Sequence, residues 1–178
     1  NEFNITASFP CAGAYSMSGI MVDLMLDMEP YGQPFYFPYV LFSYIESYPE
    51  LGTAEEYLLQ EYHDLPAMFD GFHDREEVNA AMSDVPITIM KTDSITSFET
   101  NNNHPLRVKL RDNDLWDWTP LSPMYIYHGL GDELVPYENS QKAYDQFIIN
   151  GAENVHLEAI PASIGGHCCD VPTVALLG

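Results

Sequence analysis

Basic residues are rare in this sequence. Lysine and arginine make up only 6 of its 178 residues, whereas aspartate and glutamate make up 27, and the formal net charge is -21. A surface with this charge repels nucleic-acid phosphates and anionic lipid head groups, so we expect no nucleic-acid partner. We interpret the acidity itself as that of a solvated surface.

Long apolar runs are missing as well. No segment approaches the roughly 18 consecutive apolar residues of a membrane-spanning helix, and we expect no membrane span. The first residues, Asn1 to Asn4, lack the basic start and apolar run of a signal peptide. Export nevertheless stays open, because the sequence need not begin where its gene begins.

Cysteines are few, and their spacing excludes the common zinc patterns. Cys11, Cys168 and Cys169 contain no CxxC pair, and their odd number leaves at least one thiol unpaired within the chain. Adjacent cysteines bridge each other only with strain, so a disulfide, if one forms, should join Cys11 to Cys168 or Cys169. The segment HCC, which begins at His167, offers soft metal ligands without an evident fourth ligand, and we expect no metal and no other cofactor.

What the chain does contain is an alternation of strands and helices near its C-terminus. MYIYH (Met124–His128) is typical of a buried parallel strand, Tyr137–Asn150 has helical periodicity and is followed by a glycine, and Asn154–Ile160 alternates as a strand. A further strand is expected at Phe3–Phe9. Strand, helix and strand in this order predict an α/β fold with a parallel sheet.

The middle of the chain differs in composition. Residues 31–103 are rich in aromatics and have helical periodicity, and we expect them to form a helical segment between two other parts of the chain, 1–30 and 104–178. The aromatic run Tyr31–Tyr48 fits the packing of a small helical domain. Helices are expected at Val40–Ile45, after a capping box of Thr53 with Glu56, at Asp74–Met82 and at Pro105–Arg111.

Two side chains with catalytic chemistry follow the two late strands. Asp132 lies in HGLGDELVP, directly after the first strand, and His167 ends GGH, after the second. The functional loops of a parallel sheet lie at the carboxyl ends of its strands, so these two loops should be neighbours. An aspartate beside an imidazole fixes the tautomer of the ring and stabilises the imidazolium that forms when the ring takes a proton from a nucleophile.

The segment PMYIYHGLGDELVPYENSQKAYDQFIINGA followed by GGH resembles the C-terminal end of the α/β-hydrolase fold, in its esterase, secreted-lipase and serine-peptidase branches. The resemblance implies that Asp132 is the catalytic acid and His167 the catalytic base. A weaker resemblance, over Phe3–Gly19, is to the strand and loop that follow the nucleophile helix in lipase-like members. The middle of the chain matches only in kind, and the resemblance implies that residues 31–103 are a helical lid or cap inserted into a hydrolase core, with the aromatic run Tyr31–Tyr48 either lining an acyl pocket or packing the insertion. By the same resemblance, the residues that shape the acid loop are His128, Gly129, Val135 and Pro136.

The sequence departs from this family at the nucleophile, which normally lies in GxSxG. The segment YSMSG contains Ser16 and Ser18, but Ala14 stands where the first glycine would be, and in the family this region follows the nucleophile. The oxyanion-hole loop is absent too. We therefore expect this chain to be the C-terminal half of a larger hydrolase, inactive alone, which either binds its missing half or self-associates through a cut sheet edge.

The leading functional hypothesis is a serine hydrolase that acts on carboxylic esters with an apolar acyl group, with the nucleophile in a missing N-terminal part. One alternative is a serine peptidase of the prolyl-oligopeptidase type, which shares the acid loop and GGH. Another is a non-catalytic, hydrolase-like binding protein. For location, secretion or the periplasm is favoured over the cytoplasm.

Overall fold

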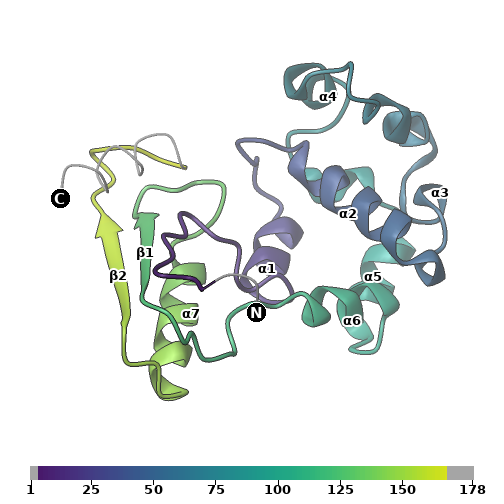
Figure 1. Ribbon diagram of the computed structural model, residues 1–178. Coiled ribbons are helices and arrows are strands. Elements are labelled where there is room, and N and C mark those ends of the chain that lie inside the picture. The colour runs from purple at the N-terminus through teal and green to yellow at the C-terminus, as the bar shows by residue number, and fades with distance from the viewer. Residues whose placement is uncertain (1–3, 168–178) are drawn as a thin grey trace. The chain divides into compact units, whose positions relative to one another are not determined.

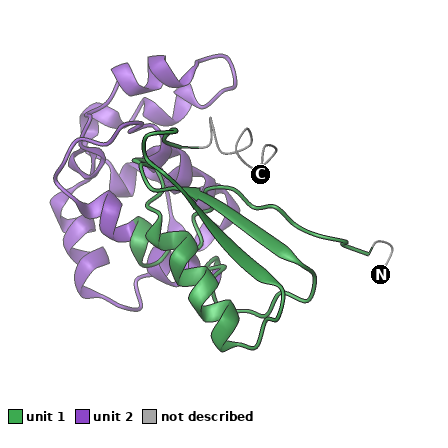
Figure 2. Cartoon of the chain, turned by 90° about the vertical axis from the view of Figure 1, so that its left-hand side faces the viewer, with its two compact units in different colours: residues 1–21, 113–178 green, residues 22–112 purple. Residues whose placement is uncertain are grey.

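The computed structural model describes residues 4–167, in which two stretches far apart in sequence fold together. Residues 1–21 and 113–178 make up unit 1, and residues 22–112 make up unit 2 (Figure 2). The insertion expected at 31–103 lies within unit 2, which extends beyond it at both ends. The sequence also predicts a helix from Val171 onward, and that segment lies outside the described residues.

Unit 1 is built around two parallel strands, β1 (Met124–Gly129) and β2 (Val155–Ile160), joined by helix α7 (Glu138–Ile149) (Figure 1). The register pairs Met124 with Val155 at one end and Gly129 with Ile160 at the other. The strand, helix and parallel strand expected from the sequence are confirmed. Because the strands are parallel, both loops that follow them leave from the same edge of the sheet.

A third segment runs beside β1, on the side away from β2. Ser8 and Cys11 form parallel bridges with Met124 and Tyr127 of β1. The strand expected at Phe3–Phe9 is therefore displaced toward the C-terminus, and it is not regular. The proline at position 10 has no N–H for a ladder, although its carbonyl accepts a hydrogen bond of 3.0 Å from Tyr127.

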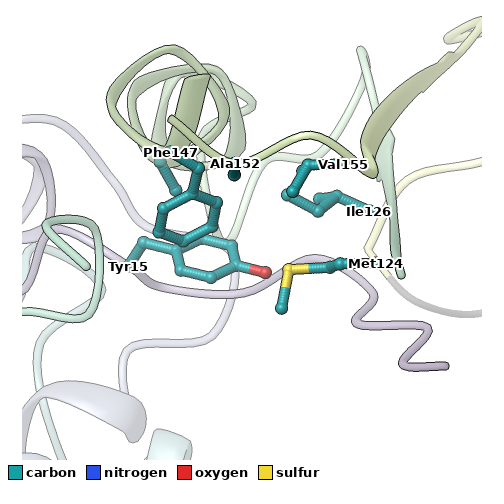
Figure 3. Packing of buried hydrophobic residues seen from close by; sticks show 7 residues of the cluster. Tyr15, Met124, Ile126, Phe147, Ala152 and Val155 are labelled. Carbon is teal, nitrogen blue, oxygen red and sulfur yellow. The ribbon is translucent and has the colours of Figure 1, made fainter. Parts of the chain in front are cut away.

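The core of unit 1 lies between α7 and the sheet (Figure 3). Phe147 is fully buried on α7, and its ring meets that of Tyr15 edge to face, with the centroids 6.4 Å apart. Burial raises the pKa of Tyr15 to about 12, and the nearby Cys11 adds to this effect. The helix ends at Ile149, and Gly151, just after the C-cap Asn150, has a φ of 88°, a conformation that glycine adopts without strain. The buried cluster consists of Tyr15, Met124, Ile126, Ala143, Phe147, Ala152 and Val155.

Unit 2 consists of short helices and turns, as expected, and a single antiparallel bridge between Leu58 and Met90 is described in it. No helix among residues 4–167 is long and apolar enough to cross a membrane. The α-helices of unit 2 are α1 (Ile20–Leu26, which begins in unit 1), α2 (Tyr36–Ser47), α3 (Ala54–Tyr57), α4 (Arg75–Ala80), α5 (Thr92–Thr100) and α6 (Pro105–Asp112). Its 3-10 turns are η1 (Pro49–Leu51), η2 (Gln60–Tyr62), η3 (Leu65–Met68) and η4 (Pro86–Ile89).

Helices α2, α4 and α6 lie where the sequence predicts helices. The capping box expected at Thr53 is wrong, because its side chain makes no cap hydrogen bond and α3 ends after one turn, at Tyr57. The reason is the next residue, Leu58, which is fully buried and extended against Met90. The capping box that does form begins α4, where Asp74 and Glu77 cap each other's backbone N–H groups.

Candidate active site

The loop between β1 and α7 places Asp132 in a buried turn. The side chain of Asp132 has no exposed surface. Its Oδ1 accepts hydrogen bonds from the backbone N–H groups of Leu134 and Val135, at 3.0 and 2.9 Å. An aspartate that binds the backbone of the residues after it is a common turn former, and here it fixes the orientation of its own carboxylate.

The loop after β2 brings His167 to the other carboxylate oxygen. Its Nδ1 lies 2.8 Å from Asp132 Oδ2, and its side chain is 22% exposed. Since an ionised carboxylate only accepts hydrogen bonds, Nδ1 carries the hydrogen and the lone pair lies on Nε2. The two side chains singled out in the sequence are thus in direct contact, and the ring has the tautomer of a general base.

A second histidine contacts the same carboxylate from inside the protein. His128, at the end of β1, is fully buried, and its Nε2 lies 3.2 Å from Asp132 Oδ2 and 2.8 Å from the carbonyl oxygen of Val135. Its Nδ1 lies 2.6 Å from Oγ of Ser140, a buried residue in the first turn of α7. The sequence suggested His128 only as a residue that shapes the loop, and Ser140 was missed.

These contacts set the charge of Asp132. Burial is the largest single influence on its pKa and raises it, but hydrogen bonds from His128, Val135, His167 and Leu134 together outweigh burial and lower the pKa to about 2. Asp132 is therefore ionised at neutral pH. An anion in this place can stabilise a proton on the neighbouring His167.

Glycines allow the two loops to touch. A Cβ on Gly129 would stand 3.1 Å from the carbonyl oxygen of Gly166, and a Cβ on Gly131 would stand 2.9 Å from Cβ of Ala162. A Cβ on Gly166 would stand 2.6 Å from Oε2 of Glu133, the end of a flexible side chain. The glycines in HGLG and GGH thus let the loops that carry Asp132 and His167 approach each other.

The two serines nearest to a nucleophile motif have other contacts. The side chain of Ser16 is fully buried, and its Oγ accepts a hydrogen bond of 2.9 Å from Nζ of Lys142. Ser18 donates its backbone N–H, at 2.9 Å, and its hydroxyl to the carboxylate of Asp114. Because the hydroxyl of Ser16 is buried, it does not reach a substrate carbonyl in this conformation.

Metal ligands do not gather in the described part of the chain. Residues 4–167 contain no group of three or more histidine, cysteine, aspartate or glutamate side chains that could hold a metal ion. The HCC segment falls mostly outside that part, as do Cys168 and Cys169, the expected disulfide partners of Cys11. Within it, Sγ of Cys11 lies 3.6 Å from the carbonyl oxygen of Phe9.

Comparison with known proteins places this geometry in a family. The model of the family described as "Secretory lipase" matches residues 37–175. A secreted triacylglycerol lipase of Malassezia globosa is 36% identical over 62 residues, which cover 35% of this chain and 13% of that protein.

Solved structures show the same fold. The rice cell wall degrading esterase LipA of Xanthomonas oryzae superposes with a TM-score of 0.77 at 21% identity, covering 99% of this chain and 47% of that one. Lipase A of Candida antarctica superposes with a TM-score of 0.65 at 18% identity, covering 93% of this chain and 38% of that one. The chain thus spans less than half the length of these proteins. The prediction of part of an α/β-hydrolase fold is confirmed, and the chain belongs to the secretory lipase family.

Proposed function

We propose that the protein is a serine hydrolase of carboxylic esters in which Asp132 is the catalytic acid and His167 the catalytic base. The observation that carries this proposal is the 2.8 Å contact between Nδ1 of His167 and Oδ2 of Asp132, made in adjoining loops at the carboxyl ends of two parallel strands. The nucleophilic serine and the oxyanion donors would come from a part of the protein outside this sequence. By itself the chain would then be inactive.

The contact is suited to acyl transfer. As the serine hydroxyl attacks the ester carbonyl, its proton passes to Nε2 of His167, and the tetrahedral intermediate forms. The same proton then passes to the leaving alcohol as the carbon–oxygen bond breaks and an acyl-enzyme remains. Water repeats the two steps and releases the acid. Throughout, the ionised Asp132 stabilises the imidazolium and keeps its ring oriented.

The relatives support an ester substrate and export. One is described as a secreted triacylglycerol lipase and another as a cell-wall degrading esterase, while the family is described as secretory. We propose that this protein is also secreted and that its substrate is an ester with an apolar acyl group.

A second part of the proposal concerns unit 2, as a lid over the substrate. Its aromatic side chains are consistent with that role. Phe35, Tyr39, Phe42 and Phe69 form a cluster of adjacent rings, and Phe72 is 92% exposed.

The outer edge of the Ser8–Ala12 segment is where the missing half would pair, or where two copies would meet. The backbone carbonyls of Ser8 and Pro10 accept hydrogen bonds from Tyr125 and Tyr127 of β1. Backbone groups alternate in direction along an extended segment, so those of Phe9 and Cys11 point to the other side. An unpaired edge of this kind is a template for another strand. Sedimentation of the isolated chain tests self-association, and a stable monomer would count against it.

Active-site labelling tests the catalytic assignment. The full-length gene product should react with a fluorescent phosphonate directed at activated serines, and His167→Ala or Asp132→Asn should abolish or strongly slow that reaction. His156→Ala is the matched control, because this histidine is exposed on β2 and stacks on Tyr125. Undiminished labelling of His167→Ala would overturn the assignment. Cleavage of prolyl peptides without cleavage of esters would overturn the substrate class.

A further inference from the structure

The carboxylate of Asp132 is held from two sides by two histidines of different character. His167 is 22% exposed and lies in the loop after β2, whereas His128 has no exposed surface and lies at the end of β1. Both approach the same oxygen, Oδ2, at 2.8 and 3.2 Å. Only the exposed histidine can exchange a proton with a substrate, so the buried one needs a separate explanation.

We propose that His128 is a positioning residue, which fixes the carboxylate of Asp132 for its partner His167 and is itself held in the required tautomer by Ser140. This proposal rests on the proposed function, because it assigns a role within the same pair. It goes further by making the acid part of a chain of four side chains, Ser140, His128, Asp132 and His167.

The tautomer of His128 follows from its neighbours. Its Nε2 faces two acceptors, the carbonyl oxygen of Val135 and the carboxylate of Asp132, so Nε2 carries the hydrogen. Its Nδ1 faces the hydroxyl of Ser140 at 2.6 Å, and a hydroxyl can donate to that nitrogen in this tautomer. The two histidines therefore carry their hydrogens on different nitrogens, Nε2 in His128 and Nδ1 in His167.

Each oxygen of Asp132 then has two donors. Oδ1 accepts from the backbone of Leu134 and Val135. Oδ2 accepts from the ring of His167 and from that of His128, whose Nε2–H is shared with the carbonyl of Val135. If His128 were removed, Oδ2 would keep only the donor on the more exposed loop. The carboxylate would be less firmly oriented, and its charge would be directed at His167 alone.

A simpler explanation is that His128 only supports the loop, through its shorter contact of 2.8 Å with the carbonyl of Val135. The two roles differ in what they do to the pH dependence of the reaction. Loss of loop support lowers activity and stability at every pH. Loss of a donor to an anion raises the pKa of that anion and strengthens its hold on the imidazolium of His167, so activity should disappear at a higher pH on the acidic side.

The kinetic experiment compares three variants of the full-length protein, assayed on a p-nitrophenyl ester over a range of pH. His128→Leu removes the donor, and we expect kcat/KM to fall about 10- to 100-fold, the effect of losing one hydrogen bond to a charged group. The acidic limb of its profile of kcat/KM against pH should also move to higher pH. His128→Gln, whose amide nitrogen can take the place of Nε2, should recover most of the activity and the original limb. Ser140→Ala should lie between them.

A second measurement reads the tautomers of the two histidines directly. In 15N-labelled full-length protein, the nitrogen shifts of the histidine rings report which nitrogen carries the hydrogen, with His128→Gln used for assignment. We expect His128 protonated on Nε2 and His167 on Nδ1. Finding His128 protonated on Nδ1 only would overturn the proposal, as would a His128→Leu variant whose acidic limb does not move. Unchanged activity in His167→Ala would instead refute the proposed function, so the two failures are distinguishable.

Discussion

Gly131 and Ala162 lie in different loops but almost touch, and a Cβ on the glycine would stand 2.9 Å from Cβ and 3.2 Å from Cα of the alanine. This contact joins the loop that carries Asp132 to the loop that leads to His167. Backbone atoms cannot move aside as the end of a side chain can. The spacing between the loops, and with it the contact of Asp132 with His167, therefore depends on a residue without a side chain at position 131.

Gly131→Ala should separate the two loops. Overpacking of this kind costs about 1–3 kcal/mol of folding free energy, and a displacement of the proposed catalytic pair by about 1 Å can lower kcat/KM about 100-fold. Denaturant midpoints and ester hydrolysis by the full-length protein measure the two effects. Ala162→Gly, combined with Gly131→Ala, should restore part of both, because it removes the nearer contact. If Gly131→Ala had full activity, the close approach would not be needed.

Asp132 should make stability depend on pH. Its pKa is lowered in the folded protein to about 2, so its contribution is complete above the unfolded-state pKa of about 3.9 and is lost as the pH falls toward 2. The shift corresponds to about 2 kcal/mol at neutral pH. We expect the difference in unfolding free energy between the wild type and Asp132→Asn to shrink by about this amount between pH 6 and pH 2.

Asp70 provides the control for that experiment. Backbone N–H groups of Phe72 and His73 and the ring of His73 also lower its pKa to about 2, but its side chain is 38% exposed. Solvent screens an exposed group, so Asp70→Asn should change the pH dependence of stability much less. Equal effects of the two substitutions would show that the hydrogen bonds of Asp132 do not stabilise the fold more because they are buried.

The sequence was sufficient for the part of the fold that carries the site. A short apolar run, a helix closed by glycine and an alternating run predicted β1, α7 and β2, and the rule that functional loops share one sheet edge brought Asp132 to His167. These features depend on local patterns. The contact of His128 with Asp132 could not be read in the same way, although the two residues are only four positions apart, because it depends on the path of the chain between them.

Where the sequence was misleading, tertiary contacts outweighed local preference. The helix after Thr53 stops because Leu58 is buried and pairs with Met90, a residue far along the chain. Helix α5 (Thr92–Thr100) was not predicted, since only Phe98 among its residues is buried and its apolar pattern is weak. A strand was expected at Phe3–Phe9, yet among the described residues of that segment only Ser8 forms a bridge to β1, and the next bridge lies beyond Pro10, at Cys11.

Phe147 should be the most sensitive position in the core of unit 1. It is fully buried between Tyr15 and Trp118, with ring contacts to both. Phe147→Ala should lower the free energy of unfolding by about 3–5 kcal/mol, because it removes a large apolar group and leaves a cavity. Ile149→Ala, two positions further along α7 and 76% exposed, should change it by less than about 0.5 kcal/mol. Urea denaturation of both variants tests the contrast, which would vanish if α7 did not pack as described.

Ser16 offers a direct test of whether this chain contains the nucleophile. The hydroxyl of Ser16 accepts a hydrogen bond from Nζ of Lys142, and the backbone N–H of Ser16 donates one to the side chain of Asn139. Nζ of Lys142 also lies 4.1 Å from the ring centroid of Trp116. These contacts tie the loop before α1 to α7, so we expect Ser16 to be structural. Ser16→Ala should cost about 1 kcal/mol of stability, because it removes the hydroxyl that accepts a hydrogen bond from the partly buried Nζ of Lys142.

The same variant should keep its reaction with a serine-directed phosphonate when it is assayed in the full-length protein well below its melting temperature. Ser18→Ala is the matched control, since its hydroxyl also binds a side chain, that of Asp114. A folded Ser16→Ala variant that no longer reacts with the phosphonate would identify Ser16 as the nucleophile. It would follow that the loop opens during catalysis, and the proposal that the nucleophile lies outside this sequence would be wrong.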